Sequence, residues 1–218
     1  MTRGTGEFAG GNGALRSILT GMPTSARDPH AAFDPGALAR KPTLPGATVT
    51  LVPLSARHTD AMWRFTDDEE TNRLTGTRRT FTQDEIRAWC TTRPEQPDRL
   101  DLAIEDRATG RFLGELALND TDPDNASAHF RIALTPGSTG RGIGTEATHL
   151  LLRHAFETVR LHRVQLEVYA YNPRAVRVYE KAGFHHEGRA RQAHHWAGEY
   201  HDVLRMAALR PEWLATHP

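Results

Sequence analysis

The sequence has 218 residues, enough for one domain with a sizeable core. Lysine plus arginine and aspartate plus glutamate each number 27, and the resulting zero net charge argues against nucleic acid as the main partner. No apolar run reaches the roughly 18 residues of a membrane-spanning helix, and residues 1–13 lack a secretion signal pattern. Cys90 is the single cysteine, which excludes an internal disulfide, so we expect a cytoplasmic protein.

The first 45 residues differ in composition from the rest. They are rich in glycine, proline, alanine and arginine and have no sustained apolar period. This pattern predicts a flexible extension over residues 1–45, with a short helix around residues 14–19, and one folded domain over residues 46–218.

The domain is predicted to begin with a strand over residues 49–52. Ser55 then reads as the N-cap of a helix, and Thr82 with Glu85 forms a capping-box pattern that opens a second helix. Three stretches of alternating polarity follow, at residues 100–105, 112–118 and 128–134, joined by short polar turns. Such spacing predicts an antiparallel meander of three strands.

The second half alternates between helices and strands. A glycine-rich segment at residues 139–145 opens a helix that runs to Val159, and a strand follows at residues 164–168. Pro173 begins a short helix that Gly183 ends, and two strands around residues 184–188 and 200–206 close the chain. The order predicts a mixed α/β fold with a mostly antiparallel sheet flanked by helices.

The glycine-rich segment has the features of an anion site. It joins a strand to a helix, whose first N–H groups lack internal partners, and glycine lets a phosphate approach the backbone closely. Glycine at such a turn can equally serve steric needs alone. No Lys-Ser or Lys-Thr follows, so the segment is not a P-loop, and the preceding meander excludes a dinucleotide-binding βαβ unit.

Two motifs resemble the GNAT N-acetyltransferase family. The segment from Gly140 to Ala147, GRGIGTEA, is similar to its acyl-CoA pyrophosphate loop, and the segment from Asn172 to Phe184, NPRAVRVYEKAGF, is similar to its second cofactor motif. The C-terminal segment GEYHD resembles the RimJ/RimL-type branch. The resemblance covers residues 47–214 and implies the GNAT fold, with acetyl-CoA as co-substrate.

The resemblance also implies a set of cofactor-binding residues. These are the backbone of the third meander strand, the phosphate loop, and the start of the following short helix with its tyrosine: Ile132, Ala133, Leu134, Thr139, Gly140, Arg141, Gly142, Ile143, Gly144, Thr145, Asn172, Ala175 and Tyr179. Thr139 departs from the basic or bulky residue usual in the family. In the family the third meander strand splays from the strand at residues 164–168, and pantetheine fills the gap.

Direct attack of an amine on a thioester requires a proton acceptor, an oxyanion site and a proton donor. Tyr179 is the candidate general acid for the leaving thiolate, against the alternative of a packed aromatic. Glu115 and Glu167 are alternative general bases, acting directly or through a water, although each could be a solvated strand residue. Family members also work without a dedicated base. The backbone N–H groups around residues 132–134 are the expected oxyanion site.

The remaining reactive side chains are expected to be structural. The adjacent pairs among the 12 histidines point to opposite faces of a strand, so we expect surface histidines and no metal. Cys90 is expected to be a buried structural thiol. Trp63, Phe65 and Trp89 either line the acceptor cleft or belong to the core.

The acceptor is expected to be a primary amine, on a small molecule in preference to a protein N-terminus. A homodimer is left open, and neither a membrane nor nucleic acid is expected as a partner. Two alternatives to the N-acetyltransferase remain: a non-catalytic acyl-CoA-binding module, and an acyltransferase that uses an aminoacyl-tRNA donor.

Overall fold

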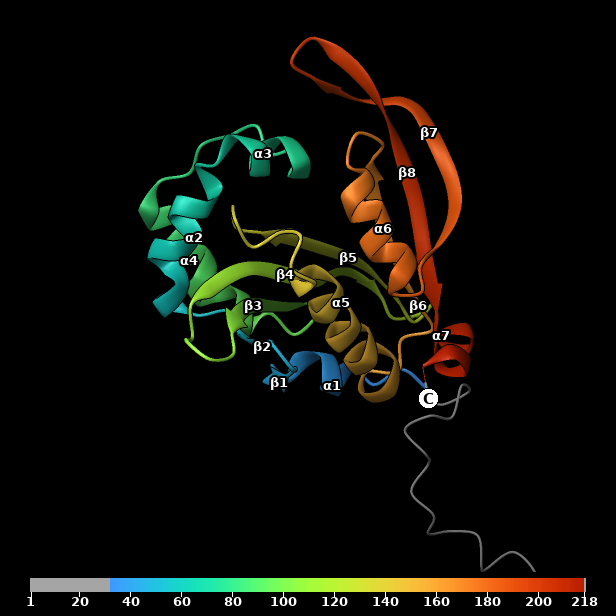
Figure 1. The fold of residues 1–218 in the computed structure, drawn as a ribbon. Coiled ribbons are helices and arrows are strands. Elements are labelled where there is room, and N and C mark those ends of the chain that lie inside the picture. The colour runs from blue at the N-terminus through green and yellow to red at the C-terminus, as the bar shows by residue number, and fades with distance from the viewer. Residues whose placement is uncertain (1–31, 218) are drawn as a thin grey trace, which may run out of the picture.

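The computed structural model describes residues 32–217, which form one layered α/β body (Figure 1). The strands of this described part are β1 (Leu44–Pro45), β2 (Val49–Pro53), β3 (Leu100–Asp106), β4 (Phe112–Asp122), β5 (Ser127–Leu134), β6 (Arg163–Tyr169), β7 (His185–Trp196) and β8 (Glu199–Leu209). The α-helices are α1 (Pro35–Ala39), α2 (Thr59–Thr66), α3 (Glu69–Thr75), α4 (Gln83–Thr92), α5 (Ile143–Arg153), α6 (Pro173–Lys181) and α7 (Arg210–Thr216).

The strands build a single sheet in the order β1-β2-β3-β4-β5-β6-β8-β7. Each neighbouring pair is antiparallel except β5 and β6, which are parallel. Strands β3, β4 and β5 form the predicted meander, with Leu102 opposite Leu116 and Leu118 opposite Phe130. The predicted fold class is therefore confirmed.

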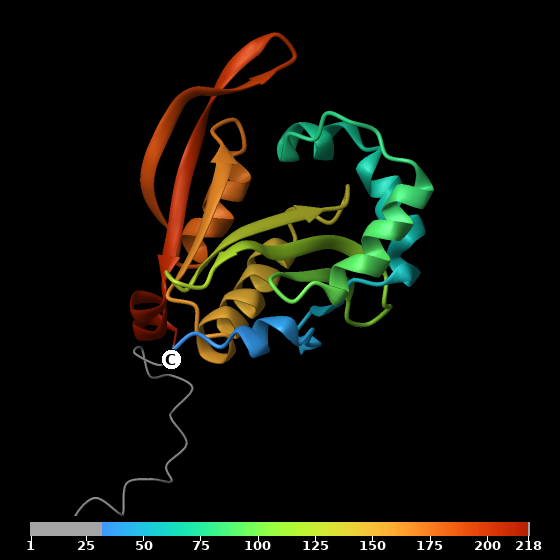
Figure 2. The same ribbon diagram turned by 180° about the vertical axis from the view of Figure 1, so that it is seen from behind.

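Helices cover both faces of the sheet, because alternate strand residues point to opposite sides (Figures 1 and 2). Leu102 and Ile104 belong to the larger core, which includes α5 and α6. Ala103 points to the other face, into a smaller core with Met62 of α2 and Cys90 of α4. The site described below lies where these two layers of helices end.

One of the two predicted helix caps is present where expected, at Thr82, whereas the N-cap of α2 is His58 and not Ser55. Ser55 precedes a short 3₁₀ turn that leads into α2. At α4, Glu85 N–H donates to Thr82 Oγ1 at 3.2 Å, and Thr82 N–H donates to the Glu85 carboxylate at 2.8 Å. Helix α3 was not predicted; the Asp68 carboxylate caps it by accepting from Thr71 N–H at 2.7 Å.

The predicted boundary at residue 45 is wrong for the part of the extension that the structure describes. Residues 32–45 pack onto the domain: Ala37 and Leu38 of α1 are buried, and Asp34 N–H donates to Val159 O at 2.8 Å. β1 then pairs with β2. The helix expected around residues 14–19 lies outside the described residues.

The C-terminal strands are longer than predicted. β7 and β8 form a long hairpin that extends well past the rest of the sheet and leans toward α3 (Figure 1). At the other end, α5 continues into a π-helical turn, His154–Thr158, before β6. None of the helices in the described residues combines the length and apolar character needed to cross a membrane.

Candidate active site

The sheet opens between two central strands. β5 and β6 pair at only three positions, from Ser127 with Arg163 to His129 with Gln165. Beyond them β5 runs on to Leu134 and β6 to Tyr169, each hydrogen-bonded only to its other neighbour. The strands therefore leave unpaired backbone groups facing a gap, and such groups require partners. This is the splay that the family resemblance implied.

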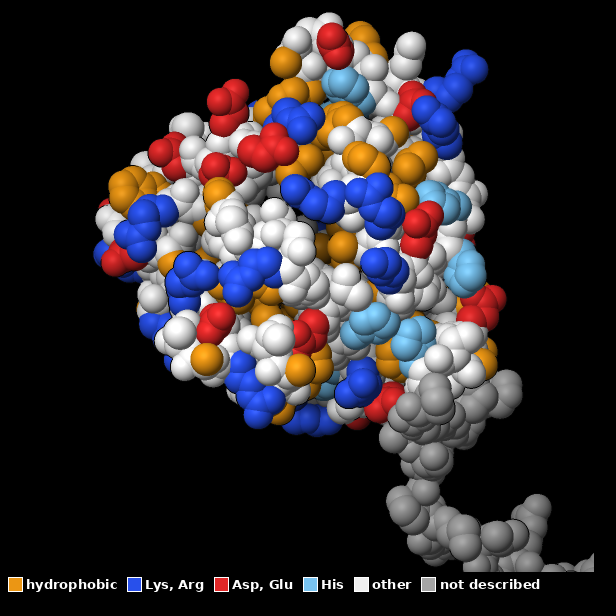
Figure 3. All heavy atoms as spheres, viewed as in Figure 1, with side chains coloured by type: hydrophobic (Ala, Val, Ile, Leu, Met, Phe, Trp, Pro, Cys, Tyr) orange, Lys and Arg blue, Asp and Glu red, His pale blue; other side chains and the backbone are white. Residues whose placement is uncertain are grey.

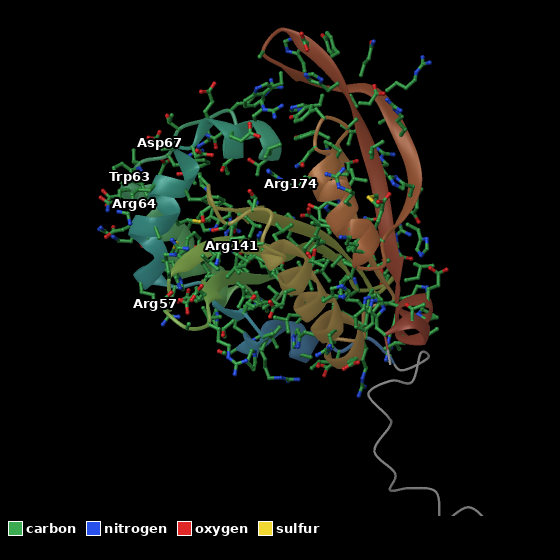
Figure 4. The ribbon with its side chains drawn as sticks, viewed as in Figure 1. Arg57, Trp63, Arg64, Asp67, Arg141 and Arg174 are labelled. Carbon is green, nitrogen blue, oxygen red and sulfur yellow. The ribbon has the colours of Figure 1, made fainter. Side chains whose placement is uncertain are left out.

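A cleft of about 550 Å³ occupies this gap. Helices α2, α3 and α4 supply one end of its lining, and the loop before α5 together with α6 supplies the other. On the face shown in Figure 3, lysine and arginine side chains gather over α6 and the loop. Arg174, Arg177 and Lys181 of α6 line the cleft, and Figure 4 places Arg174 on its α3-facing side.

The loop before α5 has the backbone that an anion site needs. Gly140 and Gly142 have φ values of +79° and +80°, and open space lies where each would carry a Cβ. Gly142 is also the N-cap of α5 and brings no capping side chain, so the first amides of this helix stay free for a ligand. The residues fit a diphosphate group.

The predicted cofactor residues fall into two groups. Most line the cleft, namely Ile132, Ala133, Leu134, Thr139, Gly140, Gly142, Gly144, Thr145, Asn172, Ala175 and Tyr179. Two others lie outside its lining: Ile143 is buried in the core at 4% exposure, and Arg141 is exposed on the loop (Figure 4). Arg141 is thus placed to reach a ligand only from the solvent side.

Asn172 and Tyr179 are held by α6. The Asn172 side-chain oxygen caps this helix by accepting from Ala175 N–H at 3.1 Å, so its amide NH₂ is the group left for a ligand. Tyr179 packs edge-on against Phe130 and Phe184, with ring centroids 6.1 and 5.8 Å away. Burial raises the pKa of Tyr179, and its hydroxyl has no hydrogen-bond partner among the described residues. Tyr179 lines the cleft, and its raised pKa keeps the phenol protonated at neutral pH.

The two candidate bases occupy different environments. Glu115 of β4 is 4% exposed; one carboxylate oxygen pairs with Arg131, and Oε2 is buried without a partner in the described part of the chain. Glu167 of β6 has a half-exposed side chain and pairs with Arg205 at 3.0 Å. Both line the cleft. Of these two carboxylates, Glu115 is the one with a buried oxygen that still requires a donor among the described residues.

The far end of the cleft is apolar. Phe65 and Trp89 line this end, which was one of the two alternatives predicted for them, and Phe81 lies beside them. Trp63 does not: it is 41% exposed, lies on the outer side of α2 (Figure 4), and donates its indole N–H to Phe81 O at 3.1 Å.

Two contacts form a bridge from α3 and the loop after it to the segments at β6 and β7, beside Thr75, Thr77 and Tyr169 of the cleft lining. Tyr171, just after β6, donates its hydroxyl to Arg73 O at 2.6 Å, and the Arg73 guanidinium lies over the Tyr171 ring. Arg78 donates to His195 O on β7 and approaches the Trp196 ring. Figures 1 and 2 show α3 and the hairpin leaning toward each other. These residues give no signal in the sequence, because only the fold brings the loop after α3 to the hairpin.

Arg131 was also missed. It lies on β5 opposite Ala117 of β4, two residues from Glu115, so the predicted antiparallel register could have indicated the ion pair. The expectation that the paired histidines lie at the surface is wrong for His194, which is buried and stacks on Tyr169 at 3.9 Å.

Other reactive groups have structural surroundings. Cys90 is buried, as predicted, and burial raises the pKa of its thiol to about 11. A thiol with that pKa is protonated at neutral pH and is a poor nucleophile. Within residues 32–217, histidine, cysteine, aspartate and glutamate side chains form no group of three or more that could hold a metal ion.

The chain is similar to acetyltransferases in sequence. The family model "Acetyltransferase (GNAT) domain" matches residues 48–185. A spermidine N(1)-acetyltransferase of Vibrio cholerae is 32% identical over 113 residues, which are 52% of this chain and 65% of the relative. The corresponding Escherichia coli K12 enzyme is 28% identical over 131 residues, with 56% and 70% covered. The putative ribosomal N-acetyltransferase YdaF of Bacillus subtilis is 32% identical over 104 residues, with 48% and 57% covered.

Solved structures agree on the fold. The crystal structure of the Vibrio cholerae spermidine N-acetyltransferase in complex with CoA and spermine superposes with a TM-score of 0.72 at 24% identity, covering 78% of this chain and 99% of that one. A GCN5-related N-acetyltransferase from Brucella melitensis gives a TM-score of 0.67 at 27% identity, covering 80% and 81%.

Proposed function

Because the chain belongs to the acetyltransferase (GNAT) family, we propose that its cleft transfers the acetyl group of acetyl-CoA to the primary amine of a small molecule. The observation that carries the proposal is the continuity of the cleft. It joins the free amides of α5, the unpaired edge of β5 and the Tyr179 hydroxyl in one cavity. Diphosphate, pantetheine and thioester would occupy these three parts in turn.

The chemistry needs one bond made and one broken. The amine nitrogen bonds to the acetyl carbon, the carbon–sulfur bond breaks, and the electron pair of that bond leaves on sulfur. Tyr179 donates its proton to the leaving thiolate, and its raised pKa keeps the phenol protonated until then. The proton that the amine loses goes to a base, and phenol and base re-equilibrate through solvent.

Glu115 is the carboxylate that we propose as this base. Its buried Oε2 has no hydrogen-bond donor among the described residues and can accept one from a water or an amine. The half-exposed Glu167, in contrast, already pairs with Arg205 beside solvent. The backbone N–H groups of residues 132–134 line the same cavity and would stabilise the oxyanion. Arg131 pairs with the other carboxylate oxygen of Glu115 and so fixes the orientation of this side chain in the cleft.

The bridge beside the cleft favours a small acceptor over a protein N-terminus. Tyr171 joined to Arg73, and Arg78 joined to His195, tie α3 and the loop after it to the opposite wall, beside residues that line the cleft. A folded protein would have to break both contacts before its terminus reached Tyr179. A free small molecule needs only the opening between them.

The proposal is tested by two measurements on the full chain. Calorimetry should detect binding of CoA, and a thiol-release assay with acetyl-CoA should show turnover with amines of a broad panel. Binding without release for any amine would support a non-catalytic acyl-CoA-binding module. Tight tRNA binding with no CoA binding would support the aminoacyl-tRNA donor.

A further inference from the structure

The acceptor end of the cleft is built mainly from apolar side chains. Six of them come from α2, α3, α4 and the loop that precedes α4: Met62, Phe65, Leu74, Phe81, Ile86 and Trp89. Most polar residues that α2, α3 and the loop after α3 add to this end are neutral threonines. A surface of this kind stabilises an apolar ligand by removing its carbon atoms from water.

Negative charge is scarce in the same space. Glu115 and Glu167 are the carboxylates among the described residues that line the cleft, and each already has an arginine partner. The acidic side chains of α3 do not line it, and one of them, Glu70, pairs with Arg73 at 3.0 Å. Each ammonium group buried without a carboxylate carries a large desolvation cost.

Positive charge is close to the apolar wall. The Arg93 guanidinium stacks on the Trp89 ring with 3.8 Å to the ring centroid, and Arg131 approaches the same ring at 5.7 Å. Arg131 also lines the cleft. A second or third ammonium on the acceptor would therefore meet an apolar surface and, among the described residues that line the cleft, no carboxylate without an arginine partner.

From this distribution we infer that the acceptor is a monoamine with an apolar body, and that polyamines are poor substrates. The inference rests on the proposed function. The single amine points toward Tyr179 with Glu115 beside it, and the apolar body lies among Phe65, Phe81 and Trp89. This preference differs from the acceptor in the names of the Vibrio cholerae and Escherichia coli relatives.

The experiment compares nonylamine with spermidine in the thiol-release assay. The two are linear chains of equal length that carry one amine and three amines, so charge number is the variable that changes. We expect kcat/KM for nonylamine to exceed that for spermidine at least tenfold, and phenethylamine to follow nonylamine. Equal values, or a higher value for spermidine, would overturn the inference and leave the proposed function standing. No release with any amine would overturn both.

Two variants, one in the apolar wall and one outside it, locate the preference. Trp89→Ala should lower kcat/KM for nonylamine at least tenfold and for spermidine less than threefold. Arg64→Ala is the control, because Arg64 is exposed on α2 and does not line the cleft, and it should change neither value by more than twofold. CoA binding by calorimetry verifies that each variant is folded. An equal loss for both amines in Trp89→Ala would show that this wall does not select the apolar body.

Discussion

The role of Tyr179 is open to a sharp test, because Tyr179→Phe removes one oxygen atom and little else. The ring keeps its contacts with Phe130 and Phe184. The hydroxyl has no hydrogen-bond partner among residues 32–217, so its loss orphans no protein group. The free energy of unfolding should change by less than about 1 kcal/mol.

Turnover should respond far more strongly. A positioned general acid contributes about 10²- to 10⁴-fold to the rate, equivalent to about 3–5 kcal/mol of barrier. We expect kcat in the thiol-release assay to decrease by a factor within that range. The Kd for CoA measured by calorimetry should stay within about threefold of the wild-type value. The pKa of Tyr179 is raised, so the wild-type profile should show no loss of activity from phenol ionisation up to pH 9.

Unchanged kcat in Tyr179→Phe would refute the acid role and leave Tyr179 as a packed aromatic. A parallel rise in Kd would instead assign the hydroxyl to cofactor binding.

Three further predictions concern the base and the stability of the fold. Glu115→Gln should lower kcat at least 100-fold, whereas Glu167→Gln should change kcat by less than about threefold; the opposite order would make Glu167 the base. Gly114→Ala should cost about 3 kcal/mol or more in urea unfolding, since φ is +152° and its Cβ would lie 2.2 Å from a carbonyl oxygen of β5, while Gly188→Ala, with open space, serves as control. Burial lowers the pKa of His154 from 6.5 to about 4, so its neutral form stabilises the fold above pH 6.5 and this contribution is lost as pH falls toward 4. Between pH 7.5 and 5 the free energy of unfolding should therefore fall by about 2 kcal/mol more in the wild type than in His154→Leu. Equal losses in the two proteins would contradict this role of His154.

Short-range patterns in the sequence predicted most of the helices and strands of the fold. The strand alternation at Leu100–Asp106 and the capping box at Thr82 are short-range signals, and both features are present. Helix α1 gave no comparable signal, because five residues that begin with proline show no period; its order comes from burying Leu38 against the domain. β7 was predicted too short, because most of its side chains are exposed and alternation is lost.

The same distinction applies to the site. The loop glycines and Tyr179 lie in contiguous motifs, so their neighbours in sequence are also their neighbours in space. Arg131 beside Glu115, and Arg78 beside the hairpin, depend on strand register and on how distant segments fold back. Trp63 and Trp89 could not be separated by sequence, because the rotation of each helix about its axis decides which one reaches the cleft.

The short pairing of β5 with β6 gives the sheet a seam. On each side of the seam a half-sheet has an inner edge of free amides and carbonyls, which in most folds would be shared with a neighbouring strand. A ligand that fills the seam replaces the missing hydrogen bonds between β5 and β6 and so links the two half-sheets. We therefore expect amide hydrogen exchange at residues 130–134 to become slower as the concentration of cofactor rises. The concentration of acyl-CoA would then determine how often the two half-sheets separate at the seam.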